Sequence, residues 1–273
     1  MLTRRGLLLT SAGMAGATAA GAVGWRATPY AVRARLGLVP EPWVPDAPEG
    51  EVRTWSLRST AMGGDIDVVT AVPAGYGDGA GLPVVVVLHG ASASAAELPG
   101  FGLGRFVSAA VEAGAAPFVL VGTDDGPTGW TATAGSDPPA LFREELPAWL
   151  GERGFGSPQA LWGWSRGAYG GLRLVVEDPG WVRALALFSP ALGDDDPVLG
   201  GLDGVRVPVG IWCGEEDQFV DSARALAAAL PTPPEVATFA PGGHTRAFWN
   251  THTLDAFGWL AGHLEDGTLR GAG

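Results

Sequence analysis

The segment Gly163-Trp164-Ser165-Arg166-Gly167 joins a short apolar run to a stretch with helical spacing. Small residues two positions either side of a serine permit the tight strand-to-helix turn that lifts a serine hydroxyl above a sheet. Residues 160–162 predict a buried strand, and apolar residues then recur at helical spacing until Asp178-Pro179-Gly180. Because 43 of the 273 residues are Gly, the motif needs this context. The region is therefore predicted to be a strand-turn-helix unit of an α/β fold.

Two backbone groups near Ser165 are expected to stabilise an oxyanion. A helix that begins after Ser165 would point its first N–H groups and its positive dipole end at charge developing there, so the Arg166 N–H is one candidate. Residues 83–88 predict a strand that ends in His89-Gly90-Ala91. A loop after an earlier strand commonly supplies the second donor, for which we expect Ala91. His89 is expected to support this loop.

An acid and a histidine follow in the chain, each after a predicted strand. Residues 207–213 run into Glu215-Glu216-Asp217, and residues 236–239 are followed by His244. Open α/β sheets place catalytic groups at the carboxyl ends of their strands. The order serine, acid, histidine is that of hydrolases with this serine turn. Glu216 and Asp217 are the rival acids, with Glu144 or Glu145 as weaker alternatives on a predicted helix.

Taken together, these motifs resemble those of the putative esterase family of α/β-hydrolases, which includes esterase D-like enzymes and the antigen 85 mycolyltransferases. The resemblance covers about residues 51–264. It implies that Ser165 is the nucleophile, Asp217 the triad acid and His244 the general base. The motifs that carry it are Leu88-His89-Gly90, Gly163-Trp164-Ser165-Arg166-Gly167-Ala168-Tyr169-Gly170-Gly171-Leu172-Arg173, Phe188-Ser189-Pro190-Ala191-Leu192, Cys213-Gly214-Glu215-Glu216-Asp217-Gln218-Phe219 and Pro241-Gly242-Gly243-His244.

The chain departs from these relatives at two places. They usually have Met where Arg166 stands, which leaves the backbone donor available. They often have a Tyr-Trp-His-like stretch where Gly129-Trp130-Thr131 stands, so the preference for acyl group and alcohol does not carry over. The aromatic residues that flank the predicted site loops are candidates for lining the substrate cleft, with core packing as the alternative for each: Trp130, Phe219, Phe248 and Trp249.

Composition excludes several classes of protein. The chain has no Lys, which excludes a Ser-Lys dyad, a Schiff-base lysine and a P-loop. Its net charge of −12 argues against a nucleic-acid partner, whose phosphates need a basic face. The lone Cys213 cannot form an internal disulfide and is expected in the core. The spacing of His252 and His263 does not match a metal site, and neither does the acidic run at residues 194–196. We therefore expect no metal and no cofactor.

The N-terminus resembles a twin-arginine export signal. Arg4 and Arg5 precede an Ala/Gly/Leu-rich segment that reaches about Val23, and small residues near position 20 fit a cleavage site. We therefore predict a signal peptide over residues 1–22, with an uncleaved anchor as the alternative. The protein is expected to be exported, and then to be either secreted or associated with the membrane or cell wall. Residues 23–50 contain a Pro-rich stretch and predict a linker.

The rest of the chain predicts a single α/β-hydrolase domain over residues 51–264, followed by a flexible tail over residues 265–273. Predicted strands alternate with helices, which indicates a mostly parallel sheet covered on both faces. Residues 52–57 and 66–72 read as an edge hairpin, and the last helix is expected over 254–264. About fifteen residues separate Pro190 from Val205, too few for a multi-helix lid. The cleft is therefore expected to be open.

The combined expectation is an exported serine esterase that acts on small-molecule, lipid or sugar acyl esters through an acyl-enzyme. One alternative is an acyltransferase that passes the acyl group to a sugar or lipid hydroxyl. Another is a non-catalytic wall-binding protein on the same fold, because fold does not fix function.

Overall fold

The computed structural model describes residues 42–193 and 195–265. The predicted signal peptide, most of the predicted linker, Asp194 and all but the first residue of the predicted tail lie outside these ranges.

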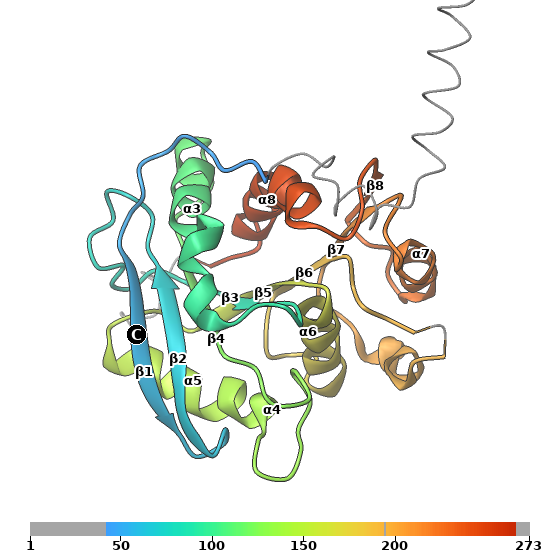
Figure 1. Ribbon diagram of the computed structural model, residues 1–273, viewed down its shortest axis with the longest axis horizontal. Helices are drawn as coiled ribbons and strands as arrows, with labels where there is room; N and C mark the ends of the chain where they lie inside the picture. The colour runs from blue at the N-terminus through green and yellow to red at the C-terminus, as the bar shows by residue number, and fades with distance from the viewer. Residues whose placement is uncertain (1–41, 194, 266–273) are drawn as a thin grey trace, which may run out of the picture. The chain divides into compact units, whose positions relative to one another are not determined.

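Eight strands form one sheet in the order β1-β2-β4-β3-β5-β6-β7-β8 (Figure 1). The β1-β2 and β2-β4 pairs are antiparallel, and all the others are parallel. The mostly parallel sheet predicted from the sequence is confirmed. The strands are β1 (Val52–Ser59), β2 (Gly64–Ala71), β3 (Val84–Leu88), β4 (Val119–Thr123), β5 (Pro158–Trp164), β6 (Ala184–Phe188), β7 (Val209–Gly214) and β8 (Val236–Ala240).

Helices cover both faces of this sheet, as predicted (Figure 1). One face packs against α5, α6 and α7, and the other packs against α3 and α8. The bounds of the helices are α3 (Leu103–Glu112), α4 (Pro138–Ala140), α5 (Leu146–Glu152), α6 (Arg166–Glu177), α7 (Val220–Ala229) and α8 (Arg246–Ala261), with a π-helical turn at Leu141–Glu145 between α4 and α5.

The central strands are apolar on both faces because both are covered. All five residues of β3 are buried, and so are all five of β6. A parallel strand between two helical layers needs such a continuous apolar run, whereas the edge strand β1 carries several exposed residues. Because burial holds the parallel strands in register, their carboxyl ends lie along one edge of the sheet. The site loops begin at that edge.

Residues 42–50 differ from the expected linker. They form a segment without helix or strand that packs on α3 and α8 before the chain enters β1 (Figure 1). The Trp43 ring meets Phe106 edge-on at 5.7 Å, and the Trp43 carbonyl accepts a hydrogen bond from Asn250 at 2.8 Å. The Pro-rich composition gave no sign of this docking.

Two further features bear on the site. Between β6 and β7 the described residues hold only one short 3₁₀ helix, Pro197–Gly204, so this connection carries no multi-helix lid. Helix α8 begins at Arg246, eight residues before the predicted start at Leu254, with Thr245 accepting a hydrogen bond from the Phe248 N–H at its N-terminus. The early start brings Arg246 and Trp249 next to the loop that carries His244.

Candidate active site

Ser165 lies at the junction of β5 and α6 in a strained backbone conformation. Its φ of +56° and ψ of −123° are unusual for a residue with a side chain. A Cβ on Gly163 would lie 2.7 Å from backbone atoms of Gly167, and one on Gly167 would lie 1.9 Å from the Leu88 carbonyl oxygen. Both glycines of the sequence motif are therefore required sterically, and the serine side chain is held at the carboxyl edge of the sheet.

His244 and Asp217 complete a chain of hydrogen bonds from this serine. The Nε2 atom of His244 lies 2.8 Å from the Ser165 Oγ, and its Nδ1 lies 2.9 Å from Oδ2 and 3.1 Å from Oδ1 of Asp217. Because a carboxylate oxygen only accepts, Nδ1 carries the proton and Nε2 is free to accept one from the serine. The structure thus brings the three residues together in the geometry of a serine triad.

Asp217 is buried but remains favourable as an anion. Burial by itself raises the pKa of this carboxyl group, yet the hydrogen bonds from His244 and Ser189, the charge of His244 and the Phe219 N–H together hold the pKa below its usual value. The Phe219 N–H donates to Oδ1 at 2.9 Å. The carboxylate therefore stays ionised and can fix the orientation of the imidazole.

Neighbouring strands supply the two loops that carry the acid and the histidine. Asp217 follows β7 and His244 follows β8, which is the next strand in the sheet. The Glu215 N–H donates to the Ala240 carbonyl, and the Glu216 N–H donates to the Gly242 carbonyl, both at 2.8 Å. These bonds hold the two loops in fixed register, so that Asp217 faces the imidazole.

The weaker rival acid Glu145 has a structural position instead. Its carboxylate accepts from the Ser59 hydroxyl at 2.5 Å and from the N–H groups of Thr60 and Ala61 at 3.0 and 2.9 Å. It therefore closes the turn between β1 and β2, which is distant in sequence from the helix on which it stands.

The loop after β3 packs directly against the serine turn. A Cβ on Gly90 would lie 3.2 Å from the Ser165 Cβ and 3.0 Å from the Trp164 ring, so this loop needs a glycine to approach so closely. Ala91 follows in this loop and is exposed. Across from it, the Arg166 N–H is the first of α6 and has no acceptor within its own helix. The loop that carries Ala91 and the start of α6 thus both approach Ser165.

His89 supports this loop from the protein interior. It is fully buried, and its Nδ1 donates to the Gly90 carbonyl at 2.9 Å. Its own carbonyl accepts a hydrogen bond from the Trp130 indole at 3.0 Å. This placement agrees with the supporting role expected for His89 and gives Trp130 a related one.

The four aromatic candidates divide into two pairs. Phe219 and Trp249 are partly exposed, and their rings meet the His244 ring at 5.2 and 5.1 Å. Trp130 is only 2% exposed and packs over Gly170, and Phe248 is 5% exposed and packs against Gly242 and His252. The expectation that Trp130 and Phe248 line the cleft is therefore corrected, because the core takes up both rings.

Sequence reasoning missed two contributors to the site. The hydroxyl of Ser189, another residue with positive φ (+46°), accepts from the Trp249 indole at 2.9 Å and takes part in holding Asp217. The guanidinium of Arg166 forms an ion pair with Asp125, which fastens the loop after β4 to the start of α6. Both are long-range pairs without a local sequence signal, although Phe188-Ser189-Pro190 did belong to the family resemblance.

Comparison with known proteins agrees with this geometry. A family model described as putative esterase matches residues 59–259. Comparison with curated protein sequences gives no significant match. Among solved structures, a ferulic acid esterase is similar with a TM-score of 0.67 at 17% identity, covering 79% of this chain and 98% of its own.

Two other solved structures have the same fold. An S-formylglutathione hydrolase from Agrobacterium tumefaciens has a TM-score of 0.66 at 19% identity and covers 82% of this chain and 99% of its own. An enterobactin esterase from Shigella flexneri has a TM-score of 0.62 at 17% identity, covering 82% of this chain and 63% of its own. At such low identity these similarities establish the fold alone. Because the family model spans well over half of the chain, the protein belongs to the putative esterase family and is a carboxylic ester hydrolase.

Proposed function

We propose that this protein hydrolyses carboxylic esters through an acyl-enzyme formed on Ser165. The observation that carries the proposal is the unbroken set of hydrogen bonds from the Ser165 Oγ through His244 to the buried Asp217. A serine hydroxyl is a weak nucleophile, and an adjacent base oriented by a carboxylate is the usual means of activating it.

In the proposed reaction, the Nε2 atom of His244 takes the proton of Ser165 as the serine oxygen bonds to the ester carbonyl carbon. The backbone N–H groups of Arg166 and Ala91 donate to the oxyanion of the tetrahedral intermediate. His244 then returns the proton to the departing alcohol as the ester bond breaks. A water molecule then gives a proton to His244 and attacks the acyl carbon. As the bond between this carbon and the Ser165 oxygen breaks, His244 returns the proton to the serine and the acid leaves, while Asp217 stabilises the charged imidazole in both halves.

The direct test is Ser165→Ala, assayed on p-nitrophenyl acetate and butyrate. Loss of the nucleophile is expected to lower turnover by a factor on the order of 10⁴ to 10⁶ with folding intact. Ser56→Ala, on the exposed face of edge strand β1, is the matched control and should retain full activity. A folded Ser165→Ala variant that hydrolyses these esters at the wild-type rate would remove the basis of the proposal.

Water is proposed as the acceptor of the acyl group, in preference to the acyltransferase alternative. The absence of a multi-helix lid between β6 and β7 in the described chain supports a site open to solvent. Incubation with an activated acyl ester and graded glycerol or trehalose, with products measured by mass spectrometry, separates the two reactions. Free acid should predominate at millimolar acceptor, whereas a predominance of new ester would assign a transferase.

Export through the twin-arginine route is proposed from the sequence of residues 1–22. In the part of the chain that the structure describes, no helix combines the length and the apolar character needed to cross a bilayer. Changing Arg4 and Arg5 to Lys should trap the protein inside the producing cell, because the route's receptor reads both guanidinium groups. Undiminished secretion of the double variant would point to another route.

A further inference from the structure

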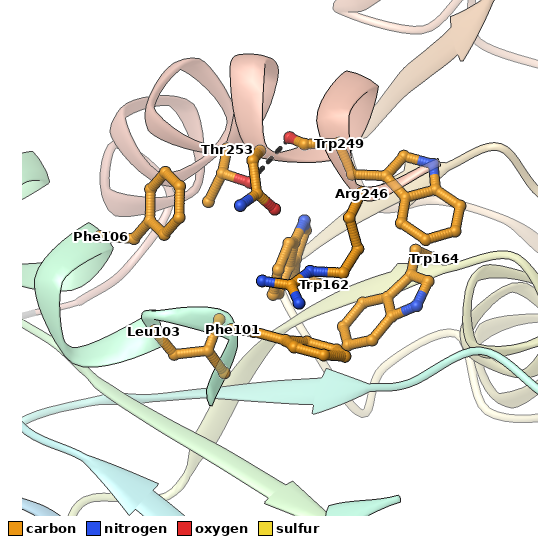
Figure 2. Close-up of a pocket in the computed structure, with 9 residues that line it drawn as sticks. Phe101, Leu103, Phe106, Trp162, Trp164, Arg246, Trp249 and Thr253 are labelled. Atoms are coloured by element: carbon orange, nitrogen blue, oxygen red, sulfur yellow. Dashed lines mark hydrogen bonds between the residues drawn. The ribbon is translucent and has the colours of Figure 1, made fainter. Parts of the chain in front are cut away.

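A small aromatic cavity lies between α8 and the segment that leads into α3 (Figure 2). Its walls include Phe101, Trp162, Trp164 and Trp249, and the side chain of Arg246 extends from the start of α8 into its centre. Arg246 has no role in the proposed triad or in the packing of the sheet described above.

The charge of Arg246 has no carboxylate partner among the described residues. A guanidinium carries five N–H donors, but within the described part of the chain Arg246 makes only one long hydrogen bond, from Nη2 to the Gly100 carbonyl at 3.4 Å. Its carbon Cζ lies 4.1 Å from the centre of the Phe101 ring, a contact that favours a cation without neutralising it. Burial lowers the pKa of Arg246, and no neighbouring group counters that effect. The cation is thus partly desolvated and uncompensated.

A second donor in the same cavity is also without an acceptor. The Nε atom of Arg246 and the Nε1 atom of Trp162 are both buried, and neither has a hydrogen-bond partner among residues 42–193 and 195–265. Buried donors of this kind are costly unless an acceptor from outside the chain meets them. The cavity has a volume of about 10 Å³, roughly the space for one oxygen-sized group. Its chemistry therefore suits an anionic oxygen better than an apolar group.

The walls of this cavity are also walls of the catalytic site. Trp164 immediately precedes Ser165. The Trp249 ring contacts the His244 ring at 5.1 Å on one side and lies 6.1 Å from the Trp164 ring. Phe101 in turn lies 5.5 Å from Trp164. The rings of Trp164 and Trp249 thus link the surroundings of Arg246 to the catalytic residues.

We propose that Arg246, with the Trp162 indole N–H, binds a carboxylate of the substrate, so that the preferred esters are those carrying a second, free carboxylate. This inference rests on the proposed function of the same site and specifies its substrate class. The carboxylate would give the guanidinium a counter-ion and would accept hydrogen bonds from donors that otherwise have none. Charge-assisted bonds of this kind are stronger than neutral ones.

The test compares matched esters that differ only in this charge. On the acyl side, the 4-methylumbelliferyl monoester of adipic acid is compared with that of its monoamide, together with shorter and longer diacids. On the alcohol side, the acetate ester of 4-hydroxyphenylacetic acid is compared with that of the corresponding amide. For at least one pair, kcat/KM is expected to favour the carboxylate by about 10-fold or more. The pair that responds identifies which half of the ester carries the charge.

Arg246→Gln is expected to abolish this preference, so that kcat/KM for the carboxylate falls to that for the amide. Arg246→Lys, which keeps the charge but loses the planar fork, should retain part of it. Arg105→Gln removes an exposed arginine of α3 and should leave the ratio unchanged. If Arg246→Gln does not fold, as judged by thermal melting, the wild-type ratios and the Arg246→Lys variant still decide the question.

Equal rates for both members of every pair, or a preference that survives in Arg246→Gln, would overturn this inference and would indicate a cavity that holds only a water molecule. Such a result would leave the proposed function standing. Failure of the proposed function would give a different result, because folded Ser165→Ala would then retain hydrolysis of charged and neutral esters alike.

Discussion

The Nδ1 of His244 lies 2.9 Å from Oδ2 and 3.1 Å from Oδ1 of Asp217, whereas the neighbouring Glu216 bonds to the histidine loop through its backbone N–H. Asp217→Asn should therefore lower kcat by roughly 10² to 10⁴, because an amide no longer fixes the required imidazole tautomer. Glu216→Gln is the matched control and is expected to stay near the wild-type rate. The opposite ranking would move the acid to Glu216.

The lowered pKa of Asp217 also predicts a pH-dependent contribution to folding stability. Since the folded-state pKa lies below the unfolded value of about 4, the stabilisation is present above that value and is lost as pH falls through the folded-state pKa. The difference in unfolding free energy between wild type and Asp217→Asn should therefore be larger at pH 5 than at pH 2.5. Urea titrations at the two pH values measure it, and a difference that grows on acidification would contradict the direction of the pKa shift.

Two glycine-to-alanine changes distinguish a steric requirement for glycine at the serine turn from the ordinary preference of a helix for alanine. A Cβ on Gly167 would lie 1.9 Å from the Leu88 carbonyl oxygen, a backbone atom that cannot move aside, so Gly167→Ala should cost more than about 3 kcal/mol. In α5, a Cβ on Gly151 meets nothing within 4 Å, so Gly151→Ala should stabilise by about 0.5–1 kcal/mol. Thermal melts of both variants measure the two changes in stability. Similar changes at the two positions would refute the predicted contrast.

The ion pair between Arg166 and Asp125 is expected to hold the loop after β4 on the start of α6. Arg166→Met keeps a stem that can pack on Gly129 but leaves the Asp125 carboxylate, with 16% of its side chain exposed, without its partner. A double-mutant cycle with Asp125→Asn should give a coupling free energy of about 1 kcal/mol by urea unfolding. Additive single-variant effects would show that the pair contributes nothing beyond its separate side chains.

The sequence predicted the parallel sheet and the order of the site loops because those features depend on local patterns. Unbroken apolar runs such as residues 84–88 have few alternatives to a buried parallel strand, and the glycines around Ser165 are a local steric requirement. Ser165, Asp217 and His244 each follow a strand, so the sheet itself brings them to one edge.

Features that depend on distant contacts could not be read in the same way. Strand β6 is short and contains two Ala among its five residues, so its local signal for a strand is weak. The first turns of α8 contain Phe248, Trp249 and Thr251, which have modest helix propensity, and packing against the sheet decides their conformation. Trp130 flanks the predicted site loops and is therefore a candidate for the cleft from the sequence, whereas its indole donates to the buried His89 carbonyl.

The central claim, that Ser165 is the activated nucleophile, is tested most directly by covalent labelling. A fluorophosphonate reacts with a serine hydroxyl only where an adjacent base activates it. We predict a single adduct on the tryptic peptide that contains Ser165, loss of ester hydrolysis in proportion to labelling, and greatly slowed labelling in His244→Ala. An enzyme that is labelled at another residue, or that keeps its full activity after Ser165 has been modified, would contradict the account.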